Sequence, residues 1–450
     1  MTEAKAAEGM LLPELLPEQR AGLPGARGRT LIERLAQAEC PALTQRRARR
    51  AEVSGAPSDP IVWSRALGCT VWDADGNRFV DMSAGFGAAA VGHAHPRVVR
   101  AIREQSGRLL HALGDLHPSD VKIELLSRLR ALGPFEDGCV MLGQNGGDAV
   151  TAAMKTAALF TSKPGVLAFE GGYHGLDYGP LAACGYGTAM RAPFEAQLNP
   201  HVAFAPYPRS EHELATSLGV VERLLSERGD LGLVLVEPVQ GRGGVVVPPS
   251  GFLEGLRAAC DRHGALLCVD EIMTGIGRTG AMLACVASGV RPDLVCLGKA
   301  LGGGMPVSAC LGERRVMAAW GDPGREALHT GTFFGHPLAC AAALAALEVS
   351  ADEDLVARAA RAGERLRAAL AQGSSGHESV IEVRSAGLLV GIELRGAGRA
   401  LSVGRALLER GYITVPAGSD ASVISLTPPL GIADELLDAF VAATREALGS

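Results

Sequence analysis

The sequence predicts an α/β fold with a parallel β-sheet and a ligand site at the edge where its strands end. Two short apolar runs, Leu266–Val269 and Leu294–Leu297, lie between turn signals and have the length and composition of buried parallel strands. The first run is followed by Asp270-Glu271 and the second by Gly298-Lys299. Because open α/β sheets bind ligands beyond the carboxyl ends of their strands, we expect the carboxylate and the amine to meet there.

The composition argues against several kinds of partner. The net charge of −6 at pH 7 argues against nucleic acid, and we interpret the basic run Arg46–Arg50 as a solvated helix end. The ten cysteines are scattered without a CxxC pair, as in proteins of a reducing compartment. No run approaches the roughly 18 apolar residues of a membrane span, and the N-terminus lacks the apolar core of a secretory signal. We therefore expect a cytoplasmic protein that binds neither nucleic acid nor membranes.

The first part of the chain is expected to form an arm, a helix and a β-hairpin. Residues 1–28 are rich in Ala, Glu, Gly and Pro, which predicts a poorly ordered arm, whereas residues 30–50 show helical spacing of leucines. Alternating runs on either side of Asp75-Gly76-Asn77 predict a hairpin. His93 and His95 could bind a metal, but no third ligand of matching spacing follows, so we expect no metal site.

A glycine turn further along the chain has the features of a phosphate site. The run Cys139–Leu142 is followed by Gly146 and Gly147, which open a helix that we expect to end near Phe160. Amides at a helix N-terminus point toward an anion, the helix dipole favours it, and glycine allows its close approach. Glycine turns also cap helices without binding a ligand, so this motif alone leaves both interpretations open.

Lys299 and Asp270 suggest a particular chemistry. Desolvation lowers the pKa of a lysine at the end of an apolar strand, and the neutral amine can form a Schiff base with a carbonyl. A nearby carboxylate can hold a protonated pyridine nitrogen, which pyridoxal 5'-phosphate needs as an electron sink. Spacing alone leaves a surface lysine and a helix-capping aspartate equally open.

A second glycine motif points to a different cofactor. Gly275–Gly280 matches the pattern GxGxxG after a strand, as in dinucleotide-binding folds. In those folds the glycines follow the strand at once and open a helix. Here Asp270–Thr274 intervenes and no clear helix begins at Gly280. We therefore do not expect a site for NAD.

The residues around Asp270 and Lys299 resemble the signature of the class III (omega) aminotransferases, which are fold-type I pyridoxal-phosphate enzymes. That signature is a hydrophobic strand, Asp-Glu, two variable residues, a Gly-rich turn and a lysine further along. The chain matches it with Asp270–Gly275, Gly277–Gly280 and Gly298-Lys299. The resemblance extends from about Gly68 to the C-terminus.

This resemblance implies an architecture of two domains, which also suits the length of 450 residues. The large domain would contain a mostly parallel seven-stranded sheet sandwiched by helices, and a smaller α+β domain would be built from both termini. The expected boundaries are 1–50 for the N-terminal arm and helix, 51–117 and 346–450 for the two parts of the small domain, and 118–345 for the large, cofactor-binding domain.

The resemblance also implies roles for single residues. Lys299 would hold pyridoxal phosphate as a Schiff base and move the substrate proton, and Asp270 would keep the pyridine nitrogen protonated. Thr332, in a turn before Pro337, would reach the phosphate of a neighbouring subunit, which implies a homodimer. The full set of expected cofactor contacts is Gly146, Gly147, Tyr173, His174, Asp270, Met273, Lys299 and Thr332.

The chain departs from its relatives at the positions that hold a substrate carboxylate. Relatives that bind amino acids usually carry an arginine at the position of Ser425, and those that act on 4-aminobutyrate carry one at Leu176. Either the amine substrate lacks a carboxylate, or another cation such as Arg242 binds it. Glu237, whose usual partner is the missing arginine, could meet a cationic amine. These four residues are the tentative substrate contacts.

The resulting prediction is an aminotransferase that moves an amino group, from a terminal (omega) amine or an amino acid, to an oxo acid or aldehyde through pyridoxamine phosphate. Met273 stands where most relatives have glutamine and is similar to the glutamate-1-semialdehyde aminomutase branch. A 1,2-aminomutase therefore remains an alternative, as does a racemase or decarboxylase on the same scaffold. A binding protein without activity is a further alternative, but pure binding would not need Lys299.

Overall fold

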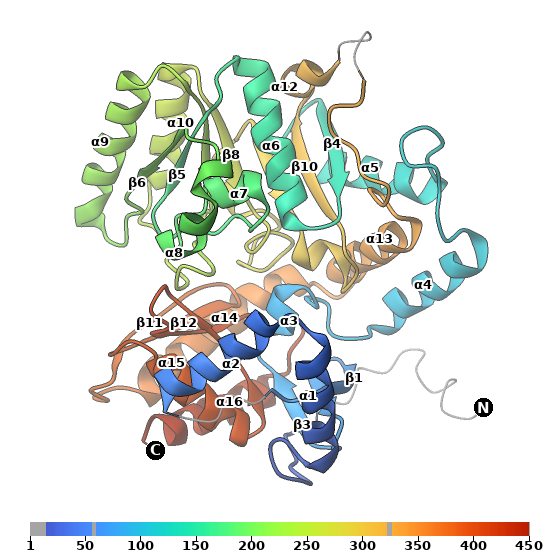
Figure 1. Cartoon of the computed structure of the whole chain (residues 1–450), viewed down its shortest axis with the longest axis vertical. Helices are drawn as coiled ribbons and strands as arrows, with labels where there is room; N and C mark the ends of the chain where they lie inside the picture. The colour runs from blue at the N-terminus through green and yellow to red at the C-terminus, as the bar shows by residue number, and fades with distance from the viewer. Residues whose placement is uncertain (1–14, 56–59, 322–325, 450) are drawn as a thin grey trace.

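A seven-stranded sheet forms the centre of the larger half of the molecule (Figure 1). The computed structural model describes residues 15–55, 60–321 and 326–449. The strands of this sheet are β4 (Gly138–Gly143), β5 (Gly165–Phe169), β6 (Val202–Ala205), β7 (Leu231–Val236), β8 (Leu266–Asp270), β9 (Leu294–Leu297) and β10 (Ser308–Glu313). Their order is β4-β10-β9-β8-β7-β5-β6; β10 is antiparallel to both its neighbours, and the other pairs are parallel. The predicted mostly parallel seven-stranded sheet is confirmed.

Helices cover both faces of this sheet because its strands are apolar on both faces. In β7, Leu233 and Leu235 belong to the buried cluster that includes α6, and Val234 and Val236 belong to the cluster on the other face, which includes α10. The longer helices of this half are α5 (Asp120–Leu132), α6 (Gly146–Thr161), α9 (Glu211–Glu227), α10 (Phe252–His263) and α13 (Pro337–Asp352). The short ones are α7 (Tyr178–Ala182), α8 (Thr188–Arg191), η1 (Ala192–Gln197), α11 (Ala284–Ala287), η2 (Lys299–Gly302), α12 (Arg314–Met317) and η3 (Ala318–Trp320).

The smaller half combines the two ends of the chain. Its first sheet has the order β1-β2-β3-β13, in which β13 (Tyr412–Ile413) runs parallel to β3 (Arg78–Asp81) of the predicted hairpin. Its second sheet is antiparallel, with the order β11-β12-β15-β14. The remaining elements are β1 (Trp63–Leu67), β2 (Thr70–Asp73), α3 (Ala84–Gly87), α4 (Pro96–Arg108), α14 (Leu355–Gly373), β11 (Val380–Ala386), β12 (Leu389–Leu394), α15 (Arg399–Glu409), β14 (Val415–Ala417), β15 (Val423–Leu426) and α16 (Asp434–Leu448). The domain boundaries at 51, 118 and 346 stay a prediction.

The N-terminal segment differs from the expectation of an arm followed by one helix. Two helices are present, α1 (Ala26–Ala38) and α2 (Pro41–Ser54), and proline at the start of α2 separates them. Residues 15–28 are not a loose arm, because Glu18 forms an antiparallel bridge with Arg78 of the hairpin. Residues 1–14 of the expected arm lie outside the described residues.

The hairpin turn also holds the start of α1. The Asp75 carboxylate accepts hydrogen bonds from the amides of Arg27 and Gly28, both at 2.8 Å, and so caps the helix in place of the N-cap residue Gly25, which has no side chain. A Cβ atom on Gly25 would lie 2.4 Å from Asp75 Cγ, so glycine permits this approach. No pattern within residues 1–50 reveals this contact, because the carboxylate comes from another segment.

The glycine motif at 275–280 serves close packing between the two halves. A Cβ atom on Gly277 would lie 3.1 Å from Val356 Cγ2, and one on Gly280 would lie 2.8 Å from Ala360 Cβ. Both neighbours belong to α14. The glycines therefore let the loop after β8 lie directly on a helix of the smaller half, which gives this motif a structural role without a dinucleotide.

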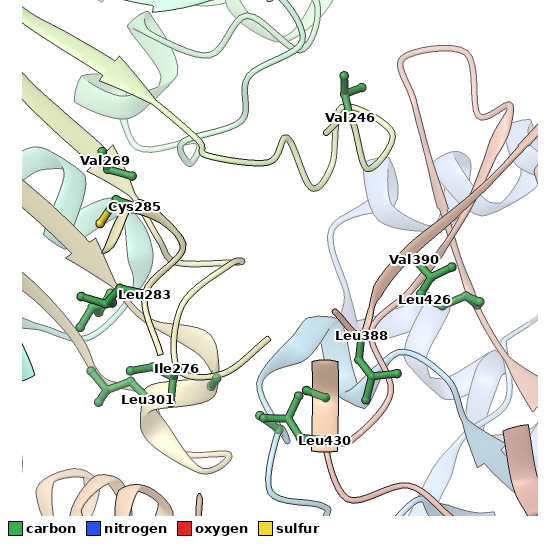
Figure 2. Close-up of a cluster of buried hydrophobic side chains, with 14 of the residues drawn as sticks. Val246, Val269, Ile276, Leu283, Cys285, Leu301, Leu388, Val390, Leu426 and Leu430 are labelled. Carbon is green, nitrogen blue, oxygen red and sulfur yellow. The ribbon is translucent and has the colours of Figure 1, made fainter. Parts of the chain in front are cut away.

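Arg278 fastens the same loop to the smaller half. Its guanidinium is fully buried and donates to the carbonyl oxygens of Leu388 at 3.0 Å and Pro428 at 2.6 Å. Burial lowers the pKa of Arg278 to about 9. Figure 2 shows the apolar surroundings of this junction, with Ile276 beside Leu301 and facing the side that carries Leu388 and Leu430.

Within the described ranges no helix is long and apolar enough to cross a lipid bilayer, and no group of three or more His, Cys, Asp or Glu side chains is placed to hold a metal ion.

We predict that Asp75→Ala releases the N-terminal helices without unfolding the rest of the chain. The substitution removes the acceptor of two amides at the start of α1, and loss of a helix cap costs about 1 kcal/mol. Limited proteolysis with mapping of the cuts should show faster cleavage between residues 15 and 38. Asp75→Asn, which keeps an acceptor oxygen, is the control. Equal cleavage of wild type and Asp75→Ala would contradict the capping role.

Candidate functional site

Three ionisable side chains follow three neighbouring parallel strands. Glu237 comes directly after β7, Asp270 ends β8 and Lys299 follows β9 after a single glycine. Because β7, β8 and β9 are paired in parallel, the carboxyl ends of all three strands lie at one edge of the sheet. The structure thus brings together the two residues singled out as catalytic and adds a second carboxylate.

Asp270 is held by a buried histidine. His174 Nδ1 lies 2.7 Å from Asp270 Oδ2, and the amide of Ile272 donates to Asp270 Oδ1 at 3.1 Å. Both side chains are about 3% exposed. Burial by itself would lower the pKa of His174, but the hydrogen bond and the charge of Asp270 outweigh it, and the pKa is raised. The pair therefore fixes a carboxylate in a defined orientation at the end of β8.

Lys299 sits in a backbone conformation that is uncommon for residues other than glycine. Its φ angle is +42°, in the left-handed region, where it begins η2. Burial lowers the pKa of the amine, the charges of Asp270 and Glu237 oppose this effect, and the charge of Arg242 reinforces it. The net pKa lies below that of an ordinary lysine. A larger share of the amine is therefore neutral and nucleophilic.

Met273 and Gly87 lie beside Lys299. A Cβ atom on Gly87 would lie 3.5 Å from Met273 Sδ and 3.8 Å from Lys299 Cδ, and one on Gly241 would lie 2.7 Å from Met273 Cγ. Gly87 belongs to α3 and has a φ angle of +84°. Gly87 lies in no motif that predicts this contact; its only sequence signal is its place in the glycine-containing run Gly85–Gly87 after the hairpin.

Glu237 braces the loop that carries Tyr173. It is 5% exposed, its Oε1 accepts from the Tyr173 amide at 2.8 Å, and its Oε2 accepts from the Gly241 amide at 3.0 Å. Burial raises its pKa, and the charge of Asp270 raises it further. Both oxygens accept one backbone hydrogen bond each, which fixes the orientation of the carboxylate; contact between Glu237 and a cationic amine stays a prediction.

The start of α6 leaves two amides without an intrahelical acceptor. The Asn145 side chain accepts from the Asp148 amide, and Asp148 Oδ2 accepts from the amides of Gln144 and Asn145, which together make a capping box. Gly146 and Gly147 come next, and first-turn amides have no acceptor within their helix. Gly298, which precedes Lys299, lies close to this helix start, since a Cβ atom on it would be 3.8 Å from Gly146 Cα. An anion bound here would lie beside Lys299.

Two tyrosines and an arginine line the outer side of the site. The guanidinium carbon of Arg242 lies 4.8 Å from the ring centroid of Tyr173 and 5.1 Å from that of Tyr186. The two rings meet edge to face at 6.3 Å. Burial raises the pKa of Tyr173, and the charge of Arg242 opposes this. Tyr186 lies in no sequence motif that predicts its place at the site.

Glu271 has a structural role that the Asp-Glu pair did not reveal. Its side chain is 1% exposed, and its Oε2 accepts from the Thr274 hydroxyl at 2.5 Å while Oε1 accepts from the Cys285 amide at 2.8 Å. It therefore closes the loop between β8 and α11.

Three further predicted contacts are Thr332, Leu176 and Ser425. Thr332 is exposed and lines a small cavity with His111 and Lys122. Leu176 is 53% exposed. Ser425 is buried in β15, opposite Gly391 of β12 and Val415 of β14.

Comparisons with known proteins agree on one family. The sequence pattern of the family described as aminotransferase class-III matches residues 53–448. An acetylornithine aminotransferase of Methanopyrus kandleri is 38% identical over 389 residues, which are 86% of this chain and 94% of that protein. A 5-aminovalerate aminotransferase of Pseudomonas aeruginosa is 35% identical over 405 residues, 86% of this chain and 93% of its own. The structure of ornithine aminotransferase from Toxoplasma gondii, described with partial occupancy of pyridoxal phosphate at its active site, matches with a TM-score of 0.78 at 31% identity, covering 86% of this chain and 90% of that one.

We predict that His174→Gln lowers the melting temperature and that the loss depends on pH. Breaking a buried charged pair costs about 3 kcal/mol. Because the folded-state pKa of His174 is raised above 6.5, the stability that its proton contributes is fully present below pH 6.5 and is lost as pH rises through the folded value. The difference between wild type and variant should therefore shrink toward alkaline pH in thermal melts. A difference that grows with pH would show that His174 is neutral in the folded protein.

Proposed function

The chain belongs to the class-III aminotransferase family and is a pyridoxal-phosphate-dependent aminotransferase of fold-type I, and on this premise we propose that Lys299 and Asp270 are its catalytic residues. The observation that carries the proposal is the meeting of Lys299, Asp270 and Glu237 at one edge of the sheet, with the pKa of the lysine lowered. The proposed reaction moves an amino group from a terminal amine to an oxo acid or aldehyde.

The residues of the site fit the cofactor. Pyridoxal phosphate, when bound, supplies a carbonyl that reacts with amines and a ring that takes up the electrons of a breaking bond. Lys299 would attach it covalently through the neutral amine and would then carry a proton as general base and acid. Asp270, oriented by His174, would keep the pyridine nitrogen protonated. The buried hydrogen bond between His174 and Asp270 supports this role of Asp270, because a carboxylate without a fixed orientation would not stay directed at the pyridine nitrogen.

The remaining contacts concern the phosphate and the ring. The amides of Gly146 and Gly147 would hold the phosphate, and the capping box supports this because Asn145 and Asp148 already satisfy the neighbouring amides. Tyr173 would pack on the ring, with Met273 beside Lys299 and Gly87.

We further propose that Thr332 acts in a homodimer. It lies on an exposed loop before α13 and lines a small cavity with His111 and Lys122. The turn that contains Thr332 resembles the family's Thr-Phe turn. By this resemblance, Thr332 would reach the phosphate bound by a second copy of the chain.

Free cysteines support a reducing compartment, which we take to be the cytoplasm. All ten cysteines are unpaired by disulfides, and most of them are buried in the two core clusters.

The proposed amine donor carries its amine at the end of a chain. The names of the relatives support this, since acetylornithine and 5-aminovalerate both carry a terminal amine that is distant from a carboxylate. The arginines that bind carboxylates in other members are replaced by Leu176 and Ser425, so the carboxylate contact would fall to Arg242. Glu237 would act on the site through its charge near Lys299.

We predict that terminal amines convert the cofactor of the loaded enzyme to its amino form. The measurement is the loss of the visible band of bound pyridoxal phosphate on titration with N-acetylornithine, 5-aminovalerate, ornithine, diamines and glutamate, with recovery on adding 2-oxoglutarate. Lys299→Ala should lack covalent attachment and turnover. Asp270→Asn should keep the cofactor and lose activity by about 10²- to 10³-fold, the scale of a removed electrostatic contact.

The same titration discriminates among the alternative reactions. Release of a carbonyl product together with loss of the band establishes transamination. Rearrangement, racemisation or decarboxylation of an amine without net loss of the band would instead support the aminomutase or the racemase and decarboxylase alternatives.

A second prediction concerns the pH at which the apoprotein takes up pyridoxal phosphate. Uptake needs the neutral amine, so its rate should rise with pH with a midpoint below the ordinary lysine value of 10.5. Arg242→Gln removes a positive charge that lowers the pKa of Lys299, so the midpoint should move up. Glu237→Gln removes a negative charge that raises it, so the midpoint should move down. Stopped-flow uptake over a pH series measures both, and equal midpoints in all three proteins would contradict the electrostatic assignment.

A further inference from the structure

The short turn α3 winds in the left-handed sense, which residues other than glycine rarely adopt. Four consecutive residues have positive φ angles: Ala84 at +44°, Gly85 at +55°, Phe86 at +63° and Gly87 at +84°. In alanine and phenylalanine this conformation brings the Cβ atom too close to the following carbonyl oxygen. Phe86 is 60% exposed, so the packing of its ring does not offset this strain. Contacts from other residues must therefore hold the turn.

Asp81, the last residue of β3, binds the turn from one side. Its carboxylate is buried, and Oδ1 accepts hydrogen bonds from the Ser83 amide at 2.8 Å and from the Ser83 hydroxyl at 2.6 Å. Oδ2 accepts from the Gly85 amide at 3.1 Å and lies 2.8 Å from His93 Nε2. His93, considered above as a metal ligand, thus pairs with this carboxylate. These bonds fix the direction in which the chain leaves β3.

Thr427 binds the turn from the C-terminal part of the chain. It is buried directly after β15, its hydroxyl donates to the Ser83 carbonyl oxygen at 2.7 Å, and its amide donates to the Met82 carbonyl oxygen at 2.8 Å. The same Ser83 carbonyl oxygen accepts from the Gly87 amide at 2.8 Å, which closes the turn. The turn is thus held by residues from both ends of the chain, 344 positions apart in the case of Thr427 and Ser83.

The turn lies against the side chain of Lys299. α3 packs on η2, which begins at Lys299, and Figure 1 shows α3 at the junction of the two halves. A Cβ atom on Gly87 would lie within van der Waals contact of Met273 Sδ, at 3.5 Å, and of Lys299 Cδ, at 3.8 Å. The gap between the turn and these two side chains therefore holds little more than a methyl group.

Burial is the largest influence on the pKa of the Lys299 amine. It lowers the pKa, the charges of Asp270 and Glu237 oppose this effect, and the charge of Arg242 reinforces it. The turn contributes to this burial because it lies beside Cδ, which is two bonds from the amine nitrogen. Movement of the turn away from Lys299 would let water reach the amine, and a hydrated amine is protonated more readily.

We propose that Asp81 and Thr427 are positioning residues for Lys299: they hold the strained turn against its side chain and so limit the access of water to the amine. The inference rests on the proposed function in taking Lys299 as the reacting amine. Strained backbone persists only where the surrounding structure over-determines it, and it gathers at functional sites. Here a carboxylate and a hydroxyl from two distant segments bind the same turn, and the residue at its end, Gly87, lies beside Lys299.

The test measures the ionisation of the Lys299 amine in the full-length apoprotein. Competitive labelling with acetic anhydride over a pH series, followed by peptide mapping, gives a labelling midpoint for each lysine, and Lys163 serves as the internal reference. Thr427→Val removes the hydroxyl that holds the turn, so the Lys299 midpoint should rise by about one pH unit as water reaches the amine. Thr427→Ser keeps the hydroxyl and should keep the wild-type midpoint.

Asp81→Asn separates loss of cover from loss of charge. Removal of a negative charge would by itself lower the pKa of Lys299, whereas release of the turn would raise it, so we expect the midpoint to rise. Thr444→Val is the matched structural control. Thr444 is as deeply buried as Thr427, and its hydroxyl donates to the Phe440 carbonyl oxygen at 2.9 Å within α16. This control should leave the Lys299 midpoint unchanged, even where it lowers the melting temperature.

The labelling needs neither cofactor nor turnover, so its outcome is separate from that of the proposed function. An unchanged or lower Lys299 midpoint in Thr427→Val or in Asp81→Asn, or an equal rise in Thr444→Val, would each overturn the inference. A Lys299 midpoint that rises in both variants, in a chain whose wild type neither binds pyridoxal phosphate nor converts an amine, would leave the positioning role standing and refute the proposed function.

Discussion

The buried pair of His174 and Asp270 is the interaction on which the candidate site depends. A carboxylate removed from water at the end of an apolar strand is costly, and it persists because a histidine and a backbone amide satisfy both of its oxygens. Its charge is felt by the two neighbouring strand ends, where it raises the pKa of Glu237 and opposes the effect of burial on Lys299. The parallel sheet brings Asp270, Glu237 and Lys299 together, and the hydrogen bond from His174 offsets the cost of burying the Asp270 charge.

The loop that follows Asp270 is held by charged side chains that bond to backbone and hydroxyl groups instead of to opposite charges. Glu271 accepts from Thr274 and from the Cys285 amide, and Arg278 donates to two carbonyl oxygens of the smaller half. Because each group is buried, breaking its hydrogen bonds would leave it unsatisfied. The same loop carries Met273, which lies beside Lys299. One loop therefore contributes both to the junction between the two halves and to the candidate site.

Much of the sheet could be predicted from sequence because strand ends carry local signals. The runs before Asp270 and Lys299 form strands at the predicted positions, since buried parallel strands are apolar on both faces. What the sequence could not show depends on partners distant along the chain. The cap that Asp75 provides for α1, the pairing of β13 with β3, and the place of Tyr186 beside Arg242 leave no periodic pattern. The glycine motif at 275–280 shows the same limit, because close packing on α14 and a phosphate turn both require glycine there.

In the proposed mechanism, Arg242 would link substrate recognition to proton transfer. Its charge is one of those that lower the pKa of Lys299, although Asp270 and Glu237 act in the opposite direction. A carboxylate bound at Arg242 would offset that charge, and the pKa of the lysine would rise while the substrate is in place. A lysine of higher pKa is a stronger base when a proton must be taken from the substrate, and one of lower pKa is more often neutral when the apoprotein takes up the cofactor. An arginine that is paired only by the substrate therefore suits both stages better than one neutralised permanently by a neighbouring carboxylate.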